Sequence, residues 1–152
     1  MFKEQITHPN RKLLDIRPFQ QMDEDSVIEL WKVCGLIVPW NNPQRDIQRK
    51  LLVQPELFLV GCFENHIVAS AMAGYEGHRG WINYLAVDPN YQRSGFATQI
   101  MDRAETLLAA AGCPKICLQV RSENTAVIEF YRKYGYEIDD VVGLGKRLES
   151  DE

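Results

Sequence analysis

Residues 81–97 read WINYLAVDPNYQRSGFA, and this stretch decides the fold. Its first seven residues are apolar and β-prone, and Asp88-Pro89 follows them as a turn signal. Apolar side chains then recur at helical spacing along one stripe, at Phe96, Ile100, Ala104, Leu107, Leu108 and Ala111. The stretch therefore predicts a strand, a short loop and a helix.

The loop that precedes this helix predicts a binding site for an anion. The first N–H groups of a helix have no intrahelical partners, and the helix dipole is positive at that end. Small residues at Gly95 and Ala97 let an anion approach the backbone closely. We expect main-chain N–H groups here to hold a phosphate or a pyrophosphate. The alternative is a plain turn in which Gly95 only relieves strain, and the loop alone favours neither reading.

Composition limits the class of protein. The chain has 152 residues, 45% of them apolar and 25% charged, which suits one globular domain. A net charge of −4 argues against a nucleic-acid partner and is compatible with a cationic substrate. No apolar run reaches membrane-spanning length and no signal-peptide pattern is present, so we expect a cytoplasmic protein without a membrane partner.

The four cysteines are Cys34, Cys62, Cys113 and Cys117. They form no C-x-x-C pair, and no histidine lies at zinc-ligand spacing from them. Buried free thiols are the expected state, and no metal site is predicted.

The other elements follow from periodicity and turn signals. Strands are expected at 13–17, 57–63, 66–75, 81–87, 115–120, 136–138 and 141–148, and helices at 23–34, 43–53, 96–111 and 125–134. The order β-α-α-β-β-β-α-β-α-β-β predicts an α/β fold whose mixed sheet joins a hairpin meander to a parallel β-α-β unit. We expect a single domain over residues 1–152.

Two motifs resemble the GNAT superfamily of N-acetyltransferases. Gln92-x-x-Gly95-x-Ala97 after a strand resembles its acetyl-CoA motif, Q/R-x-x-G-x-G/A. The segment 124–136 resembles its second motif, Asn-x(6)-Tyr ending in Gly-aromatic. The expected element order matches that family along nearly the whole chain. Segments 39–41 and 144–148 also look like a YpeA-type bacterial branch, with the ribosomal-protein N-terminal acetyltransferases as its neighbours.

The resemblance implies acetyl-CoA as co-substrate, held between splayed fourth and fifth strands by backbone groups. The residues that it places at the coenzyme are Leu85, Ala86, Val87, Gln92, Arg93, Ser94, Gly95, Phe96, Ala97, Thr98, Asn124 and Tyr131. From spacing alone, Tyr131 is favoured as a core member of an aromatic stripe, and its position in the motif reverses that preference; Asn124 is also a helix N-cap, a role that can coexist with coenzyme binding.

The implied reaction is direct transfer of an acetyl group to a neutral primary amine of a small molecule, peptide or protein. Tyr131 is the implied acid for the leaving thiolate, and an N–H group of strand 81–87 would polarise the thioester carbonyl. No metal and no covalent enzyme intermediate are required.

The general base is not evident from the sequence. The ribosomal-protein enzymes carry a glutamate on the fifth strand where this chain has Gln119, which cannot act as a base. Glu76 is a candidate, as is His78, although each is also an ordinary solvated turn residue. Trp40 and Asn41 lie on the loop expected to line the acceptor pocket, where Trp40 is either an acceptor platform or a plug of the core.

The sequence allows two alternatives to acetyl transfer. A CoA-binding regulatory module without catalysis is favoured by Gln119 and opposed by Tyr131. A dinucleotide or nucleoside-triphosphate binder is disfavoured, because neither G-x-G-x-x-G nor G-K-S/T occurs. A homodimer is possible for a domain of this size.

Overall fold

The computed structural model describes residues 11–152 and contains one five-stranded sheet in the order β1-β2-β3-β4-β5. The predicted domain 1–152 includes residues 1–10, which lie outside the described part. The strands are β1 (Asp15–Pro18), β2 (Phe58–Phe63), β3 (His66–Tyr75), β4 (Gly80–Val87) and β5 (Ile116–Leu118). β1 to β4 form an antiparallel meander, and β4 pairs with β5 in parallel. The expected mixed sheet is confirmed.

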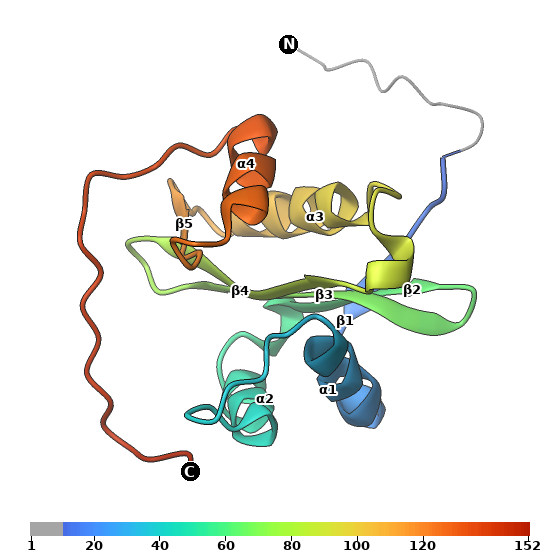
Figure 1. The fold of residues 1–152 in the computed structure, drawn as a ribbon, viewed down its shortest axis with the longest axis horizontal. Helices are drawn as coiled ribbons and strands as arrows, with labels where there is room; N and C mark the ends of the chain where they lie inside the picture. Colours follow the sequence, from blue (N-terminus) through green and yellow to red (C-terminus); the bar gives the residue numbers. More distant parts are fainter. Residues whose placement is uncertain (1–10) are drawn as a thin grey trace.

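Helices cover both faces of the sheet (Figure 1). α1 (Glu24–Val33) and α2 (Pro43–Leu51) lie on one face, and α3 (Phe96–Ala110) and α4 (Thr125–Tyr134) lie on the other. Short 3-10 turns, η1 (Gln21–Asp23), η2 (Pro55–Leu57) and η3 (Pro89–Tyr91), connect the elements. Among residues 11–152, no helix has the length and apolar character needed to cross a membrane.

Each face of the sheet has its own apolar layer. On the α1 and α2 side, Trp31, Phe58 and Ile47 are fully buried. On the α3 and α4 side, Phe96 and Ile100 lie in a layer to which Leu85, Val87 and Tyr131 also belong. Burial of such side chains stabilises the fold by about 1.5–3 kcal/mol each, so the two layers fix the sheet between the helix pairs.

A β-bulge divides β4 into two halves. Asn83 pairs with Met72 and Ala86 pairs with Ser70, so Tyr84 and Leu85 together oppose a single residue of β3. Tyr84 has a positive φ of 50°, which is rare for a residue with a side chain. The bulge reverses the alternation of faces: Ile82 packs toward α3, whereas Tyr84 packs toward α1.

The side chain of Ser70 fixes this bulge from the neighbouring strand. Its hydroxyl donates to the carbonyl of Tyr84 at 2.8 Å and accepts from the Trp31 indole N–H at 2.9 Å. The Trp31 and Tyr84 rings stack with their centroids 3.8 Å apart. Because Ser70 is fully buried, water cannot replace either hydrogen bond.

Substitution of Ser70 by alanine is therefore expected to destabilise the protein. It leaves the Trp31 N–H and the Tyr84 carbonyl without partners in the interior, at a cost of about 1–3 kcal/mol for each group. Urea unfolding should show a lower midpoint with an unchanged slope. Ser122→Ala is the control, since Ser122 is exposed and, among residues 11–152, its hydroxyl bonds only Glu123. Equal stability of the two variants would contradict the role of Ser70.

β4 and β5 pair over three residues only. Gly80, Trp81 and Ile82 face Ile116, Cys117 and Leu118, and β5 then ends. The second half of β4, from Asn83 to Val87, has no strand on that side within the described residues. The expected separation of these two strands is present, and it begins at the bulge.

The two closing strands predicted at 136–138 and 141–148 are wrong. Residues 136–152 contain no strand and run from α4 past the end of the sheet to α2 (Figure 1). Val142, Leu144 and Leu148 are 86–95% exposed, so no alternating apolar face packs against β5. The segment is held near β5 by an ion pair of 3.0 Å between Lys115 and Asp139 rather than by strand pairing. Gly143 and Gly145 also weaken strand formation.

The cysteines are free, as predicted, but none is fully buried. All four are half-buried. The Cys34 thiol donates to the carbonyl of Val87 at 3.3 Å, and burial raises its pKa. Cys34 therefore has a structural role, and its thiol contacts the end of β4.

Candidate active site

The loop between β4 and α3 presents a row of unpaired backbone N–H groups. Gly95 is the N-cap of the 15-residue helix α3 with φ 79°, and Arg93 also has a positive φ of 66°. Within residues 11–152, no acceptor takes the N–H groups of Arg93, Gly95, Phe96, Ala97 and Thr98. A Cβ at Gly95 would meet nothing within 4 Å, so this end of the helix is open. The loop has the donors and the positive dipole that an anion requires.

The loop is held in place by aromatic packing beneath it. Phe96 is buried, and its ring lies 5.4 Å from Phe63 and 6.0 Å from Tyr91 between centroids. One turn further along α3, the Gln99 side chain accepts from the Leu14 N–H, 2.9 Å away. These contacts fix the first turn of α3, so the N–H groups are oriented before any ligand binds.

The second half of β4 offers further backbone groups at the open edge. The Asp88 N–H donates to Val68 on β3, and alternate residues of a strand direct their backbone groups to the same neighbour. Ala86 therefore faces β3, whereas Leu85 and Val87 face the side where β5 has ended. The bulge produces this arrangement, because without it Ala86 would face the open edge.

Tyr131 lies on the other wall of this region, on α4. Its side chain is buried in the same apolar layer as Leu85 and Val87, with its ring 5.2 Å from Phe130. The Tyr131 hydroxyl donates to no group among residues 11–152. Every wholly buried side-chain oxygen of these residues has a hydrogen-bond partner, so the Tyr131 hydroxyl, which has none, is not wholly buried although the side chain is. Burial raises the pKa of Tyr131 to about 12, which keeps the phenol protonated at neutral pH.

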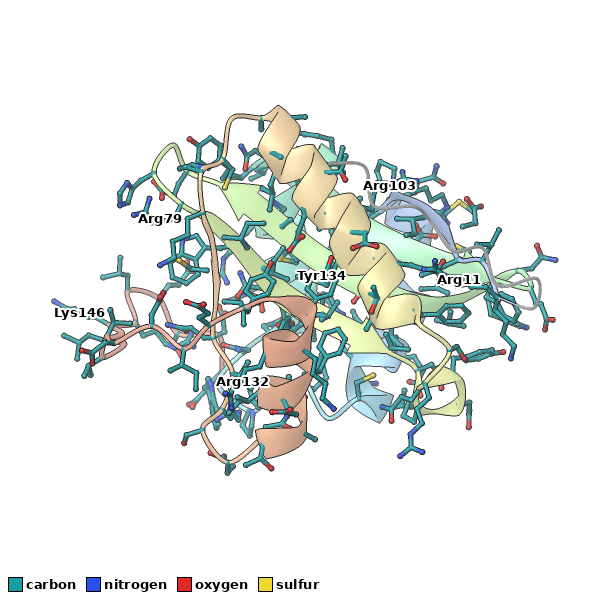
Figure 2. The ribbon with its side chains drawn as sticks, turned by 90° about the horizontal axis from the view of Figure 1, so that it is seen from above. Arg11, Arg79, Arg103, Arg132, Tyr134 and Lys146 are labelled. Carbon is teal, nitrogen blue, oxygen red and sulfur yellow. The ribbon has the colours of Figure 1, made fainter. Side chains whose placement is uncertain are left out.

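The neighbouring tyrosines differ from Tyr131 because their hydroxyls are occupied. Tyr134 donates to Asp102, and Tyr136 donates to Glu105 at 2.7 Å. Figure 2 shows Tyr134 between α4 and α3, where these carboxylates lie. Burial and the carboxylates raise the pKa of both tyrosines. Of these three aromatic side chains, Tyr131 alone has a hydroxyl without a partner in the described chain.

Asn124 begins α4 as its N-cap. Its side-chain oxygen accepts from the Val127 N–H at 3.4 Å, and the residue is exposed. The predicted capping role is confirmed. The side-chain amide N–H groups remain available to a ligand, because the cap uses only the oxygen.

The structure places Glu76 and His78 in the turn before β4, away from the bulge. The Glu76 carboxylate accepts from the backbone N–H groups of His78 and Arg79 and is exposed. At about 3.3 Å per residue, roughly 16 Å of strand separates Gly80 from Leu85. The carboxylate thus stabilises its own turn, and the structure does not bring it together with the open edge of β4.

Trp40 and Asn41 lie on the loop between α1 and α2 and contact the chain beyond β5. The Trp40 ring is 46% exposed, with the Arg121 guanidinium 5.5 Å from its centroid. The Asn41 side chain accepts from Arg147 at 2.9 Å. Trp40 consequently lies at the surface and does not plug the core.

Two features of this region could not be found by inspecting the sequence. The bulge at Tyr84 carries no glycine to mark it, and Ser70 is one of several small residues on β3. The contact between the Tyr84 hydroxyl and Asp46 at 2.5 Å joins residues 38 positions apart. It connects β4 to α2, and the only sequence signal is a tyrosine in a half-buried strand.

Comparison with known proteins defines the class as an acyltransferase. The model of the acetyltransferase (GNAT) family matches residues 20–136, and the chain belongs to this family. An acetyltransferase of Yersinia pestis (strain Pestoides F) is 50% identical over 139 residues, covering 91% of this chain and 99% of the relative. An acetyltransferase of Pectobacterium atrosepticum is 49% identical, covering 91% of this chain and 98% of the relative.

A solved structure with a bound CoA-containing analogue shares the fold of this chain. AAC(6')-Iy, in complex with the bisubstrate analogue CoA-S-monomethyl-acetylneamine, superposes with a TM-score of 0.73 at 18% identity, covering 89% of this chain and 99% of that chain. At this identity the likeness concerns the fold alone.

Proposed function

We propose that this protein transfers an acetyl group from acetyl-CoA directly to a primary amine. The observation that carries the proposal is the row of N–H groups at the start of α3 that have no acceptor within residues 11–152, in the loop that follows the open edge of β4. A pyrophosphate and an extended amide-containing arm need those two sites in that order. The CoA-containing analogue bound to a protein of the same fold supports this reading.

Each part of the site has a role in this proposal. The N–H groups of Arg93 and of residues 95–98 hold the pyrophosphate, whereas the Ser94 N–H donates to the Tyr91 carbonyl at 3.3 Å and shapes the loop that begins at Gln92. Leu85 and Val87 pair through their backbone with the pantetheine arm, Ala86 lies between them and keeps the strand paired to β3, and Asn124 offers its side-chain amide. One of the outward N–H groups of β4 donates to the thioester oxygen as negative charge develops there.

Tyr131 donates the proton that the leaving thiolate takes up. Its phenol stays protonated at neutral pH. Because its pKa of about 12 lies above the roughly 8.5 of a thiol, the phenol acts while the C–S bond is breaking, by a hydrogen bond to the sulfur that carries its proton across, and the phenol then regains a proton that the amine releases. The amine attacks the thioester carbon, the C–S bond breaks, and CoA leaves as a thiol. The proton that the amine loses goes to the phenol or to solvent, because Glu76 and His78 lie in the turn before β4, away from the open edge of that strand.

A CoA-binding module without catalysis is the second candidate. Gln119 is exposed and cannot accept the proton of an amine, and this favours a module without catalysis. The hydroxyl of Tyr131, which has no partner within the described residues, argues against such a module, since a protein that only binds CoA needs no proton donor.

One experiment separates the two functions. Acetyl-CoA is titrated calorimetrically into the protein, and thiol release is then followed with a panel of primary amines. Transfer predicts saturable binding and thiol release accelerated by at least one amine. Binding without acceleration by any amine supports the module, and the absence of binding contradicts both.

A further inference from the structure

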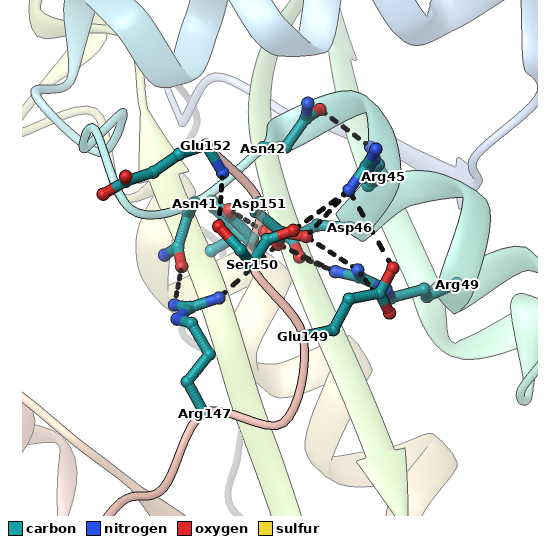
Figure 3. Close-up of polar contacts among 11 residues, drawn as sticks. Asn41, Asn42, Arg45, Asp46, Arg49, Arg147, Glu149, Ser150, Asp151 and Glu152 are labelled. Carbon is teal, nitrogen blue, oxygen red and sulfur yellow. Dashed lines mark hydrogen bonds and ion pairs between the residues drawn. The ribbon is translucent and has the colours of Figure 1, made fainter.

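Three arginines surround a single carboxylate of the chain's own last segment. Arg49 donates two parallel hydrogen bonds to Asp151, at 2.9 and 2.8 Å. Arg45 and Arg147 place their Nη1 atoms 3.5 and 3.7 Å from the same carboxylate (Figure 3). The Asp151 side chain is only 2% exposed, although it belongs to a segment without helix or strand. We call these three arginines the arginine cluster.

The arginine cluster has the geometry of an anion-binding site. Arg45 and Arg49 are one turn apart on α2, so their like charges repel each other, and a bound anion offsets this repulsion. The paired hydrogen bonds from Arg49 are the arrangement in which a guanidinium recognises a carboxylate. These bonds, with Arg45 and Arg147, lower the pKa of Asp151 to about 2, so the carboxylate is ionised at neutral pH.

The other contacts of the segment that supplies Asp151 are mainly polar and exposed, among them hydrogen bonds from Arg45 to the Ser150 carbonyl at 3.2 Å and from Arg147 to Asn41 at 2.9 Å. Leu144 and Leu148 are 95% and 91% exposed, so they contribute almost no apolar burial. Glu149 adds longer contacts, 3.5 Å to Arg49 and 3.9 Å to Arg45, and its side chain is 71% exposed. A free carboxylate of similar size can therefore compete with Asp151 for the arginine cluster.

The arginine cluster lies beside the region proposed for the acceptor. An open surface hollow of about 620 Å³ is lined by Arg49 and residues 145–149. Arg147 also donates to Asn41 on the loop between α1 and α2. Asp46 lies 3.4 Å from Arg49 and accepts from the Tyr84 hydroxyl, which connects the cluster to the bulge of β4.

We propose that the arginine cluster binds a carboxylate of the amine acceptor, and that Asp151 occupies this position when no acceptor is bound. The proposal rests on the acetyl-transfer function proposed above and narrows its substrate class to amines that carry a carboxylate. An acceptor of this kind exchanges with Asp151, and its carboxylate then takes the two hydrogen bonds of Arg49.

The first test measures binding of an anion without any chemistry. Succinate is titrated calorimetrically into the wild-type protein and into the double variant Glu149→Gln/Asp151→Asn, which removes both competing carboxylates. We expect about tenfold or tighter binding in the double variant, since one charge-assisted hydrogen bond accounts for roughly a 10- to 100-fold change. Adding Arg49→Gln to the double variant should abolish the binding.

The second test measures discrimination between acceptors. Thiol release is followed with matched pairs of amines, β-alanine against β-alaninamide and leucine against leucinamide. In the double variant we expect KM to fall about tenfold for the carboxylate of each pair and to stay unchanged for the amide. Arg49→Gln should raise KM for the carboxylate and remove the difference. Arg132→Gln is the control for loss of one arginine, because Arg132 makes an exposed ion pair with Glu129 on α4, outside the arginine cluster.

The outcomes separate this proposal from the one on which it rests. Unchanged succinate binding in the double variant, with its fold intact by circular dichroism, shows that the ion pairs only fasten the segment and overturns the proposal. Equal KM changes for carboxylate and amide overturn it as well. Succinate binding that depends on Arg49, together with acetyl-CoA binding but no acetylation of any amine, supports the anion site and contradicts acetyl transfer.

Discussion

Gly95→Glu is expected to lower acetyl-CoA affinity by at least about 100-fold. A glutamate at the N-cap of α3 places a negative charge among the N–H groups proposed to hold the pyrophosphate, and loss of several charge-assisted hydrogen bonds costs about 3 kcal/mol or more. The φ of 79° at Gly95 adds strain for any side chain, of about 1 kcal/mol. Calorimetric titration of acetyl-CoA measures the change, and the far-ultraviolet spectrum checks the fold.

The other end of the same helix provides the control. Gly112 follows α3, has a φ of 90°, and a Cβ there would also meet nothing within 4 Å. Gly112→Glu therefore introduces the same charge and a similar backbone strain at a distance from the loop. We expect it to retain wild-type affinity, and Gly95→Ala to lose only about tenfold. Intact binding in Gly95→Glu would remove the assignment of residues 92–98.

Tyr131→Phe is expected to lower kcat about 100-fold and to leave acetyl-CoA affinity near the wild-type value. The substitution removes a hydroxyl without a partner in the described residues and keeps the buried ring, so packing and binding change little. General acid catalysis contributes about 10²- to 10⁴-fold, and thiol release with a good acceptor measures the loss.

The pH dependence of kcat and a control variant at a neighbouring tyrosine test this prediction further. Because burial raises the pKa of Tyr131 to about 12, the acid stays protonated up to roughly that pH, and Tyr131 itself causes no loss of kcat between pH 6 and about 10. Tyr134→Phe is the control, since that hydroxyl already donates to Asp102. It should lower stability with little change in kcat; equal kcat losses in both variants would contradict the proton-donor role.

Much of the fold follows from local patterns. The apolar run 81–87, the turn at Asp88-Pro89 and the helical stripe after Gly95 all correspond to observed elements. Glu64 and Asn65, the two residues between the expected strands 57–63 and 66–75, form a turn with positive φ at both residues. Such predictions succeed because side-chain periodicity and turn chemistry act within a few residues of each other.

The features that the sequence did not reveal depend on distant contacts. The bulge in β4 is set by Ser70 and Trp31, which come from other elements. The closing strands were predicted from β-prone residues such as Val141 and Val142, but a strand also needs a partner and a packed face. Asp151 looks like part of a frayed acidic tail until the arginines of α2 are brought beside it.

Recognition of the coenzyme at β4 would use the main chain, whose chemistry is the same for every residue type. At Leu85 and Val87 the side chains pack inward while their amides face outward. An apolar replacement of similar volume at either position would keep both the packing and the ligand-facing donors. This part of the active site can therefore vary in sequence without losing its chemistry, and a search for invariant side chains would overlook it.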